Sequence, residues 1–304
     1  MDRLPPDAPP APLVLPRRHV LGAGAALLTT LAGCGGGGGG GGGAVPLLPI
    51  PPAPSPSPAP APAPSPGVGR NEDFRLTARA NGASYPINVY LPPDHASGEQ
   101  RFPTIYITDA DAVYVQGQTR FANFQSLTAA ARKQAILVGI GNTARRGTDY
   151  DLPGAQQYND FLLKELVPLI ESRYRADPGA RMLSGLSLGG SFVVIAMLLQ
   201  ARAGSLAFSH FLSSDGAFHS SYGTQLDALE EEVYKLRAEA GIPATLFLTY
   251  GTEAPSNAEA VQRFGQRLRA RNYPNLRLVM DGYAAGHLGM DPLAFQAALS
   301  RFVA

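Results

Sequence analysis

The chain has 304 residues, 45% of them hydrophobic, with 25 lysine and arginine residues against 24 aspartate and glutamate residues. A net charge this close to zero, without any run of basic residues, argues against a nucleic-acid partner. One cysteine excludes an intrachain disulfide, and no histidines and cysteines stand at metal-ligand spacing, so neither a metal site nor a cofactor is expected.

Residues 1–33 have the pattern of an export signal. Arg17 and Arg18 precede an apolar region that is too short to span a membrane, and Leu31-Ala32-Gly33-Cys34 follows it. This last sequence resembles the bacterial lipobox, in which the cysteine is acylated and begins the mature chain. We therefore expect a lipoprotein signal peptide over 1–33 and a lipid anchor at Cys34. The arginine pair also resembles a twin-arginine signal, which leaves two export routes open.

Residues 34–66 have the composition of a tether. Nine glycines follow Cys34, and proline, alanine and serine dominate residues 46–66. Glycine tracts are flexible and proline tracts are extended, and neither can bury a core. We expect an exported lipoprotein of the cell envelope, membrane-anchored on the periplasmic or cell-surface side. Without residues 1–33, which hold three basic and two acidic residues, 22 of each remain.

Residues 67–304 are enough for one α/β domain. Asn81-Gly82 lies between two strand-like runs and predicts an antiparallel hairpin. Strand and helix patterns then alternate, which predicts a mostly parallel sheet with helices on both faces. The predicted strands are 74–79, 85–91, 103–108, 135–141, 181–185, 207–213, 244–250 and 276–281. The predicted helices are 120–133, 155–174, 188–202, 224–240, 256–271 and 291–303.

A nucleophile elbow is predicted at Gly185-Leu186-Ser187-Leu188-Gly189. The pattern G-x-S-x-G follows a short apolar run and opens a long apolar helix, the context in which it marks a catalytic serine. Glycines two residues before and after Ser187 remove side chains that would collide in so sharp a turn. A glycine-rich helix start with a merely exposed serine is disfavoured by the flanking strand and helix.

A serine nucleophile needs a base, and His287 is the best candidate among the five histidines. It lies in a glycine-rich loop between the last predicted strand and the closing helix. It also follows Ser187 in the chain order serine, acid, histidine that α/β-hydrolases use. His219, in a loop, is a second candidate, whereas His210 lies in an alternating strand and is expected to pack in the core.

The acid that orients the base is expected after the strand over 244–250, which points to Glu253. Asp215, at the end of the preceding strand, is the runner-up because a carboxylate there can reach the same imidazole. Glu259 is a third candidate, although it has the setting of a helix-face residue. A serine-histidine pair without a strong carboxylate is the remaining alternative.

An oxyanion hole needs two N–H donors. The N–H of Leu188, directly after the nucleophile, is expected to be one of them. The loop after the strand over 103–108 supplies the other from Asp109, Ala110 or Asp111, with Ala110 preferred.

Arg145 and Arg146 form a pair of cations in a loop near the carboxyl edge of the predicted sheet. Their guanidinium groups are expected to bind an anionic or catecholate substrate. The alternative is that they pair with Asp149 and Asp151 and order the loop.

The order of these motifs resembles a known family. The segments 106–111, 166–174, 184–190 and 286–287 look like those of the esterase D and enterochelin esterase group of α/β-hydrolases, over about residues 72–302. Val138-Gly139-Ile140-Gly141-Asn142, followed by the two arginines, is similar to the branch that cleaves siderophore esters. The resemblance implies an α/β-hydrolase fold and an ester substrate, such as a siderophore, acyl or feruloyl ester.

The expected function is therefore that of a lipid-anchored serine hydrolase that cleaves carboxylic esters through an acyl-enzyme. An acyltransferase or a peptidase would use the same machinery, because fold and triad do not determine the acceptor. A non-enzymatic alternative, a degenerate hydrolase domain acting as a surface binding lipoprotein, is motivated by the uncertain acid.

Overall fold

The computed structural model of the chain describes residues 69–115 and 117–303. The predicted signal peptide, the lipid anchor at Cys34 and the tether over 34–66 lie outside these residues and stay predictions. Within the described part of the chain, no helix combines the length and the apolar character needed to cross a membrane.

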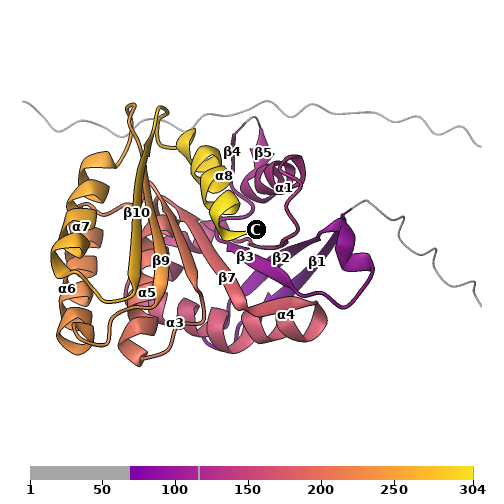
Figure 1. Ribbon diagram of the computed structural model, residues 1–304, viewed down its shortest axis with the longest axis horizontal. Coiled ribbons are helices and arrows are strands. Elements are labelled where there is room, and N and C mark those ends of the chain that lie inside the picture. Colours follow the sequence, from indigo (N-terminus) through magenta and orange to yellow (C-terminus); the bar gives the residue numbers. More distant parts are fainter. Residues whose placement is uncertain (1–68, 116, 304) are drawn as a thin grey trace, which may run out of the picture. The chain divides into compact units, whose positions relative to one another are not determined.

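The domain is built around an eight-stranded sheet with the strand order β1-β2-β6-β3-β7-β8-β9-β10 (Figure 1). β2 pairs antiparallel with β1 and with β6, whereas all other neighbours run parallel. This confirms the mostly parallel α/β sheet and the hairpin at Asn81-Gly82. The strands are β1 (Arg70–Thr77), β2 (Ser84–Leu91), β3 (Phe102–Ile107), β6 (Ile136–Ile140), β7 (Ala176–Leu186), β8 (His210–Ser214), β9 (Ala244–Gly251) and β10 (Leu276–Tyr283).

Helices cover both faces of the sheet, as the alternating pattern predicts (Figure 1). Two of them, α1 (Arg120–Ala130) and α8 (Met290–Phe302), pack on one face, and the others build a larger core on the opposite face. Those others are α3 (Gly154–Phe161), α4 (Val167–Arg173), α5 (Leu188–Ala203), α6 (Ser220–Arg237) and α7 (Ala258–Arg271). Short helical turns lie at η1 (Pro93–Ala96), η2 (Thr143–Arg145) and α2 (Arg146–Asp149).

The helix that follows the elbow lies deep in this larger core. Thirteen of the sixteen residues of α5 are buried, which is why its sequence is apolar on every side. Because α5 begins directly after Ser187, the packing of this helix holds the elbow in place.

Several element bounds differ from the predicted ones, most of all at the start of β7, which was predicted over 181–185, and two features were not predicted at all. A small hairpin of β4 (Val113–Val115) and β5 (Gln118–Thr119) follows β3, and its strands are too short to carry a recognisable alternation. The helix predicted over 155–174 is divided by a π-helical segment, η3 (Leu162–Leu166), just before Pro168. Proline has no N–H to donate, so the regular hydrogen-bond ladder is interrupted there.

Candidate active site

Ser187 forms the sharp turn between β7 and α5, with φ 60° and ψ −120°. The conformation is strained for a residue with a side chain, and the backbone around it is closely packed. A Cβ at Gly185 would collide with the carbonyl oxygen of Gly189, and one at Gly190 would come within 2.9 Å of the Ser214 carbonyl oxygen. The Ser187 N–H donates to that Ser214 oxygen at 3.0 Å. The structure therefore has the predicted elbow, and glycines are required around it.

His287 is paired with Asp215 through its Nδ1, which lies 2.5 Å from Oδ2 of that carboxylate. Asp215 is fully buried, follows β8 directly and has φ 43°. The N–H groups of Gly251 and Asn257 donate to the carboxylate at 3.2 and 2.9 Å. The carboxylate is thus oriented by two backbone donors and presents one oxygen to the imidazole.

The loop after β9 holds this pair from the other side. The Asn257 side-chain amide donates to the Asp215 carbonyl at 2.8 Å, and the His287 N–H donates to the Pro255 carbonyl at 2.7 Å. Both residues of the pair are therefore held in place by the same segment.

Glu253, the acid preferred from the sequence, is not the partner of His287. It is exposed, and its backbone N–H donates to the Ala285 carbonyl at 3.3 Å. The physical reason is that Asp215 turns into the site directly from the end of β8, where the N–H groups of Gly251 and Asn257 hold its carboxyl group against the imidazole. Glu259 is also exposed and lies in the first turn of α7. The runner-up Asp215 is therefore the residue that the structure brings to the histidine.

Ser187 and His287 line the same two neighbouring cavities. One is enclosed, with a volume of about 80 Å³, and the other is more open, with about 270 Å³. The enclosed cavity is lined by Asp109, Ala112, Tyr114, Arg120, Thr143, Arg146, Leu186, Ser187, His287 and Leu288. The open cavity is lined by Ser187, His219, Pro255, Ser256, Asn257 and His287. The predicted nucleophile and the predicted base thus lie next to the same cavities, although they come from two separate segments of the chain.

Of the two predicted oxyanion-hole donors, the Ala110 N–H is already bonded within the fold, and the Leu188 N–H stays a prediction. The Ala110 N–H donates to the Ile140 carbonyl at 3.1 Å, and the Asp109 N–H is directed to the Tyr150 hydroxyl at 3.2 Å. Among the described residues, no acceptor is found for the N–H of Asp111 or of Leu188. Since Leu188 is the first residue of α5, its N–H lies at the positive end of the helix dipole.

Arg145 and Arg146, the two arginines predicted to bind substrate, make different contacts. Arg145 makes a forked ion pair with Asp149 at 3.1 and 2.9 Å, so it orders its own loop, as the alternative interpretation expects. Arg146 lines the enclosed cavity, where Nη2 donates to the Leu186 carbonyl and pairs with Oδ2 of Asp109, both at 3.2 Å. The binding prediction is therefore wrong in placing Arg145 at the site, and Asp151 pairs with neither arginine among the described contacts.

Asp109 gives the enclosed cavity a buried carboxyl group. Burial raises the pKa of Asp109, and the nearby Arg146 and Arg120 guanidinium groups oppose that rise. Its Oδ1 has no hydrogen-bond partner among the described residues, and the Nε of Arg146 is likewise unpaired there. Two residues that line this cavity therefore each carry one buried polar atom without a hydrogen-bond partner among the described residues.

The other histidines have separate surroundings. His210 packs its ring against Phe302 and Phe247, with centroids 4.8 and 6.2 Å away, which confirms the expected packing role. His219 lines the open cavity and is exposed. No group of three or more metal-ligating side chains occurs within residues 69–115 and 117–303.

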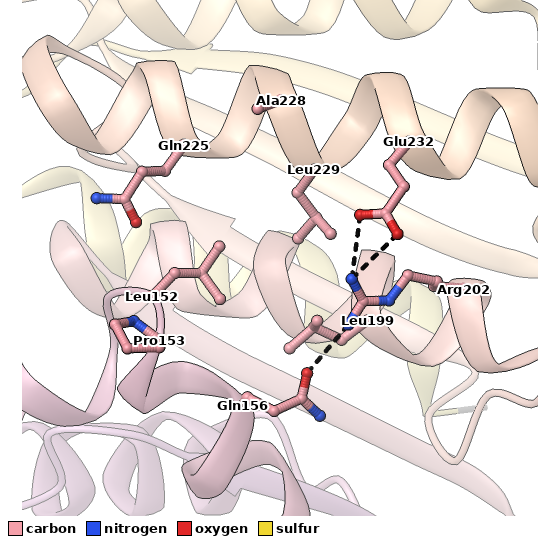
Figure 2. A pocket seen from close by; sticks show the side chains of 9 residues that line it. All are labelled: Leu152, Pro153, Gln156, Leu199, Arg202, Gln225, Ala228, Leu229 and Glu232. Atoms are coloured by element: carbon pink, nitrogen blue, oxygen red, sulfur yellow. Dashed lines mark hydrogen bonds and ion pairs between the residues drawn. The ribbon is translucent and has the colours of Figure 1, made fainter.

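A wider groove of about 490 Å³ lies elsewhere, between α3, α5 and α6 (Figure 2). Three of its polar side chains are paired with one another, since Arg202 bridges Glu232 and Gln156. Neither a serine nor a histidine lines it. Its size alone would favour this groove as the active site, but the candidate nucleophile and base line the cavities at Ser187 instead.

The sequence reasoning missed Arg120 and Asp291, a buried ion pair behind the enclosed cavity. An aspartate in the first turn of a helix is favoured by the helix dipole wherever it lies, and an arginine at a helix start is commonly exposed, so neither residue signals a buried pair. Their partnership spans 171 residues and leaves no local pattern.

Known proteins resemble this chain both in part of its sequence and in its fold. Residues 78–210 match the model of the family described as "Putative esterase". No curated protein matches the chain. An IroE-like serine hydrolase from Shewanella oneidensis has a similar structure, with 23% identity, a TM-score of 0.63, and coverage of 76% of this chain and 79% of that one.

Two further solved structures are similar. The siderophore hydrolase EstB from Aspergillus nidulans has 19% identity and a TM-score of 0.63, covering 81% of this chain and 98% of that one. A ferulic acid esterase has 19% identity and a TM-score of 0.54, covering 77% and 96%. At these identities the structural likeness establishes the shared fold. The chain therefore has the α/β-hydrolase fold, and its residues 78–210 are similar to the putative esterase family, which supports a carboxylic ester hydrolase.

Proposed function

We propose that this protein is a serine esterase that cleaves carboxylic esters through an acyl-enzyme at Ser187. One observation carries the proposal: His287 shares two cavities with Ser187 and is bonded through Nδ1 to the buried carboxylate of Asp215. A buried carboxylate on Nδ1 sets the imidazole tautomer, which leaves Nε2 free to accept a proton.

In the first half of the reaction, Ser187 Oγ attacks the ester carbonyl while His287 takes the hydroxyl proton. The negative charge that develops on the carbonyl oxygen is stabilised by the N–H groups of Leu188 and Asp111, for which no acceptor is found among the described residues. The imidazolium that forms is stabilised by Asp215. His287 then gives its proton to the leaving alcohol, and the acyl group stays on Ser187.

In the second half, water takes the place of the alcohol. His287 accepts a proton from the water as the resulting hydroxide attacks the acyl carbonyl, and the same two N–H groups stabilise the second oxyanion. The proton returns to Ser187 Oγ as the carboxylic acid leaves. The cycle needs no group beyond the side chains and backbone donors named here.

The substrate is proposed to be a siderophore ester or another acyl or feruloyl ester. The similar proteins include a siderophore hydrolase and a ferulic acid esterase, which supports this class. An enclosed cavity of about 80 Å³ is smaller than the roughly 150 Å³ that holds a benzene ring, so an aromatic ring fits only the open cavity. Arg146, at the enclosed cavity, would bind an anionic or polar part of the ester.

The uncertain acid was the reason to consider a degenerate domain that only binds. With Asp215 beside His287, that reason no longer applies. Acyl transfer or peptide cleavage would use the same residues, and no contact at the site favours either over hydrolysis.

The proposal is tested by assaying the protein on p-nitrophenyl, feruloyl and catechol-siderophore esters, next to Ser187→Ala. We expect turnover of at least one ester by the wild type and its loss in the variant, with an unchanged melting temperature because a methyl group fits the same elbow. A variant as active as the wild type, or a wild type inactive on the whole panel, would contradict the proposal.

We also propose that the protein is exported and anchored in the cell envelope through a lipid on Cys34, on the basis of the lipobox-like sequence and the tether that follows it. Cell fractionation of Cys34→Ser tests this. We expect the variant to leave the membrane pellet, and retention of the variant there without detergent would contradict the anchor.

A further inference from the structure

A fully buried ion pair contributes one residue, Arg120, to the lining of the enclosed cavity beside Ser187 and His287. Arg120, the first residue of α1, is 1% exposed, and Asp291, in the first turn of α8, is 0% exposed. The guanidinium group holds the carboxylate in a fork, with Nε 2.8 Å from Oδ2 and Nη2 3.0 Å from Oδ1. The Tyr114 hydroxyl also donates to this carboxylate. We call these two charged residues the Arg120 clamp.

The remaining donors of Arg120 bind the ends of two central strands. Nη1 donates to the carbonyl of Thr108, just past β3, at 3.0 Å and to that of Ser184, in β7, at 3.3 Å. Nη2 donates to the Ser184 hydroxyl at 2.9 Å. The guanidinium carbon lies 4.5 Å from the centroid of the Phe124 ring, so one face of the group is closed by an apolar side chain.

The three anchor points are close in sequence to the three working parts of the site. Thr108 directly precedes the loop that carries the Asp111 N–H, and Ser184 lies three residues before Ser187. Asp291 lies four residues after His287, and Arg120 itself lines the enclosed cavity together with Ser187 and His287. One rigid guanidinium group therefore joins the oxyanion loop, the elbow strand and the histidine loop.

Stability alone does not account for this arrangement. Burying two charges is costly, and replacing a buried ion pair by apolar side chains of similar volume is often neutral or stabilising. The planar fork of arginine does offer a geometry that apolar packing cannot copy, because its five donors point in defined directions.

We propose that the Arg120 clamp is a positioning device that holds the His287 loop at working distance from Ser187. This inference rests on the proposed esterase function. Asp215 orients the imidazole ring through Nδ1, whereas the clamp sets where the backbone of the loop lies relative to the elbow. A displacement of about 1 Å between reacting groups can lower a rate about 10²-fold, so a modest shift of this loop would be costly.

Glu230 provides a matched control away from the site. It is also 0% exposed, is held by the arginines Arg267 and Arg271, and accepts a tyrosine hydroxyl, that of Tyr273, at 2.8 Å. These residues join α6 to α7 and line neither cavity next to Ser187. Asp291→Asn and Glu230→Gln therefore remove equivalent charges, one within the clamp and one outside it.

The experiment measures kcat, KM and the melting temperature for both variants. We expect both to melt earlier than the wild type, but only Asp291→Asn to lower kcat, by about 10²-fold with KM within about twofold. Arg120→Lys, which keeps the charge, should recover part of the kcat that Arg120→Met loses. Equal kcat values for Asp291→Asn, Glu230→Gln and the wild type would overturn the proposal.

Two further measurements keep the test decisive. If Asp291→Asn does not fold, Tyr114→Phe can replace it, because this variant removes one hydrogen bond to the same carboxylate. We expect a fluorophosphonate to label Ser187 more slowly in Tyr114→Phe than in the wild type. An unchanged labelling rate would contradict the clamp. Amide hydrogen exchange needs no activity: Arg120→Met should accelerate exchange in residues 284–291, and Glu230→Gln should not. A wild type without ester turnover would refute the proposed function, whereas unchanged exchange in Arg120→Met would refute the clamp.

Discussion

The ends of β8 and β9 each offer a carboxylate near the histidine loop, and only one of them reaches His287. Asp215, after β8, is buried and accepts two backbone N–H groups, whereas Glu253, after β9, is exposed. The β9 loop instead supplies the supports of the site, namely the N–H of Gly251, the N–H of Asn257 and the carbonyl of Pro255. A carboxylate near a histidine thus orients it only when burial and hydrogen-bond donors hold it there, and the neighbouring loop contributes through its backbone groups.

The largest effect is expected from Asp215→Asn. The amide is similar in size but cannot hold the imidazole in the tautomer that frees Nε2, so kcat should fall by about 10³ to 10⁴ while KM changes little. Steady-state kinetics on a p-nitrophenyl ester measure this. A variant within tenfold of the wild-type kcat would show that the contact at 2.5 Å is structural only.

A smaller effect is expected from Asn257→Ala, which tests the support from the β9 loop. The variant keeps the backbone N–H that binds the carboxylate and loses the side-chain bond to the Asp215 carbonyl. A hydrogen bond of this kind contributes about 1 kcal/mol, so kcat should fall up to about tenfold. A loss as large as that of Asp215→Asn would mean that Asn257 contacts the substrate itself.

The opposite end of β8 is expected to matter for stability but not for catalysis. Burial lowers the pKa of His210, with the charge of Arg277 adding to the effect. Because the folded pKa lies below the unfolded value of about 6.5, stability is lost as the pH falls through that value towards the folded pKa. Urea unfolding of His210→Phe between pH 7.5 and 5 should therefore show a weaker loss towards acid than the wild type, at unchanged kcat. An identical pH dependence in both proteins would contradict the assignment.

The smallest effect is expected from Glu253→Gln. The side chain is exposed and makes no described contact with the histidine, so kcat and KM should stay within about twofold of the wild type. Parallel kinetics with Asp215→Asn make the comparison direct. If Glu253→Gln were the slower of the two, the roles of the two strand ends would be reversed.

The parts of the site that could be predicted are those whose signals lie within a few neighbouring residues of the sequence. The G-x-S-x-G turn could be predicted because its requirements are local. A Cβ at position 185, 189 or 190 would come too close to neighbouring atoms, so these positions need glycine. His287 could be found from its place between the last strand and the last helix. The alternation of apolar segments likewise predicts the parallel sheet and its two covered faces.

The remaining parts depend on contacts between distant segments. The choice of Asp215 depends on which loop turns towards His287, and the sequence signal for Asp215, its place at the end of a predicted strand, does not distinguish it from Glu253. Ala110 was ruled out as an oxyanion donor by a bond to Ile140, on a neighbouring strand. The Arg120 clamp joins residues 171 positions apart, so it could not be found without the fold.

The central claim, an acyl-enzyme at Ser187 served by His287 and Asp215, is tested most directly by covalent labelling. The wild type is treated with a fluorophosphonate, and the adduct is located by peptide mapping with mass spectrometry. The account predicts one adduct, on Ser187, formed far more slowly in Asp215→Asn and at the wild-type rate in Glu253→Gln. An unlabelled wild type, or an adduct on a different residue, would contradict it.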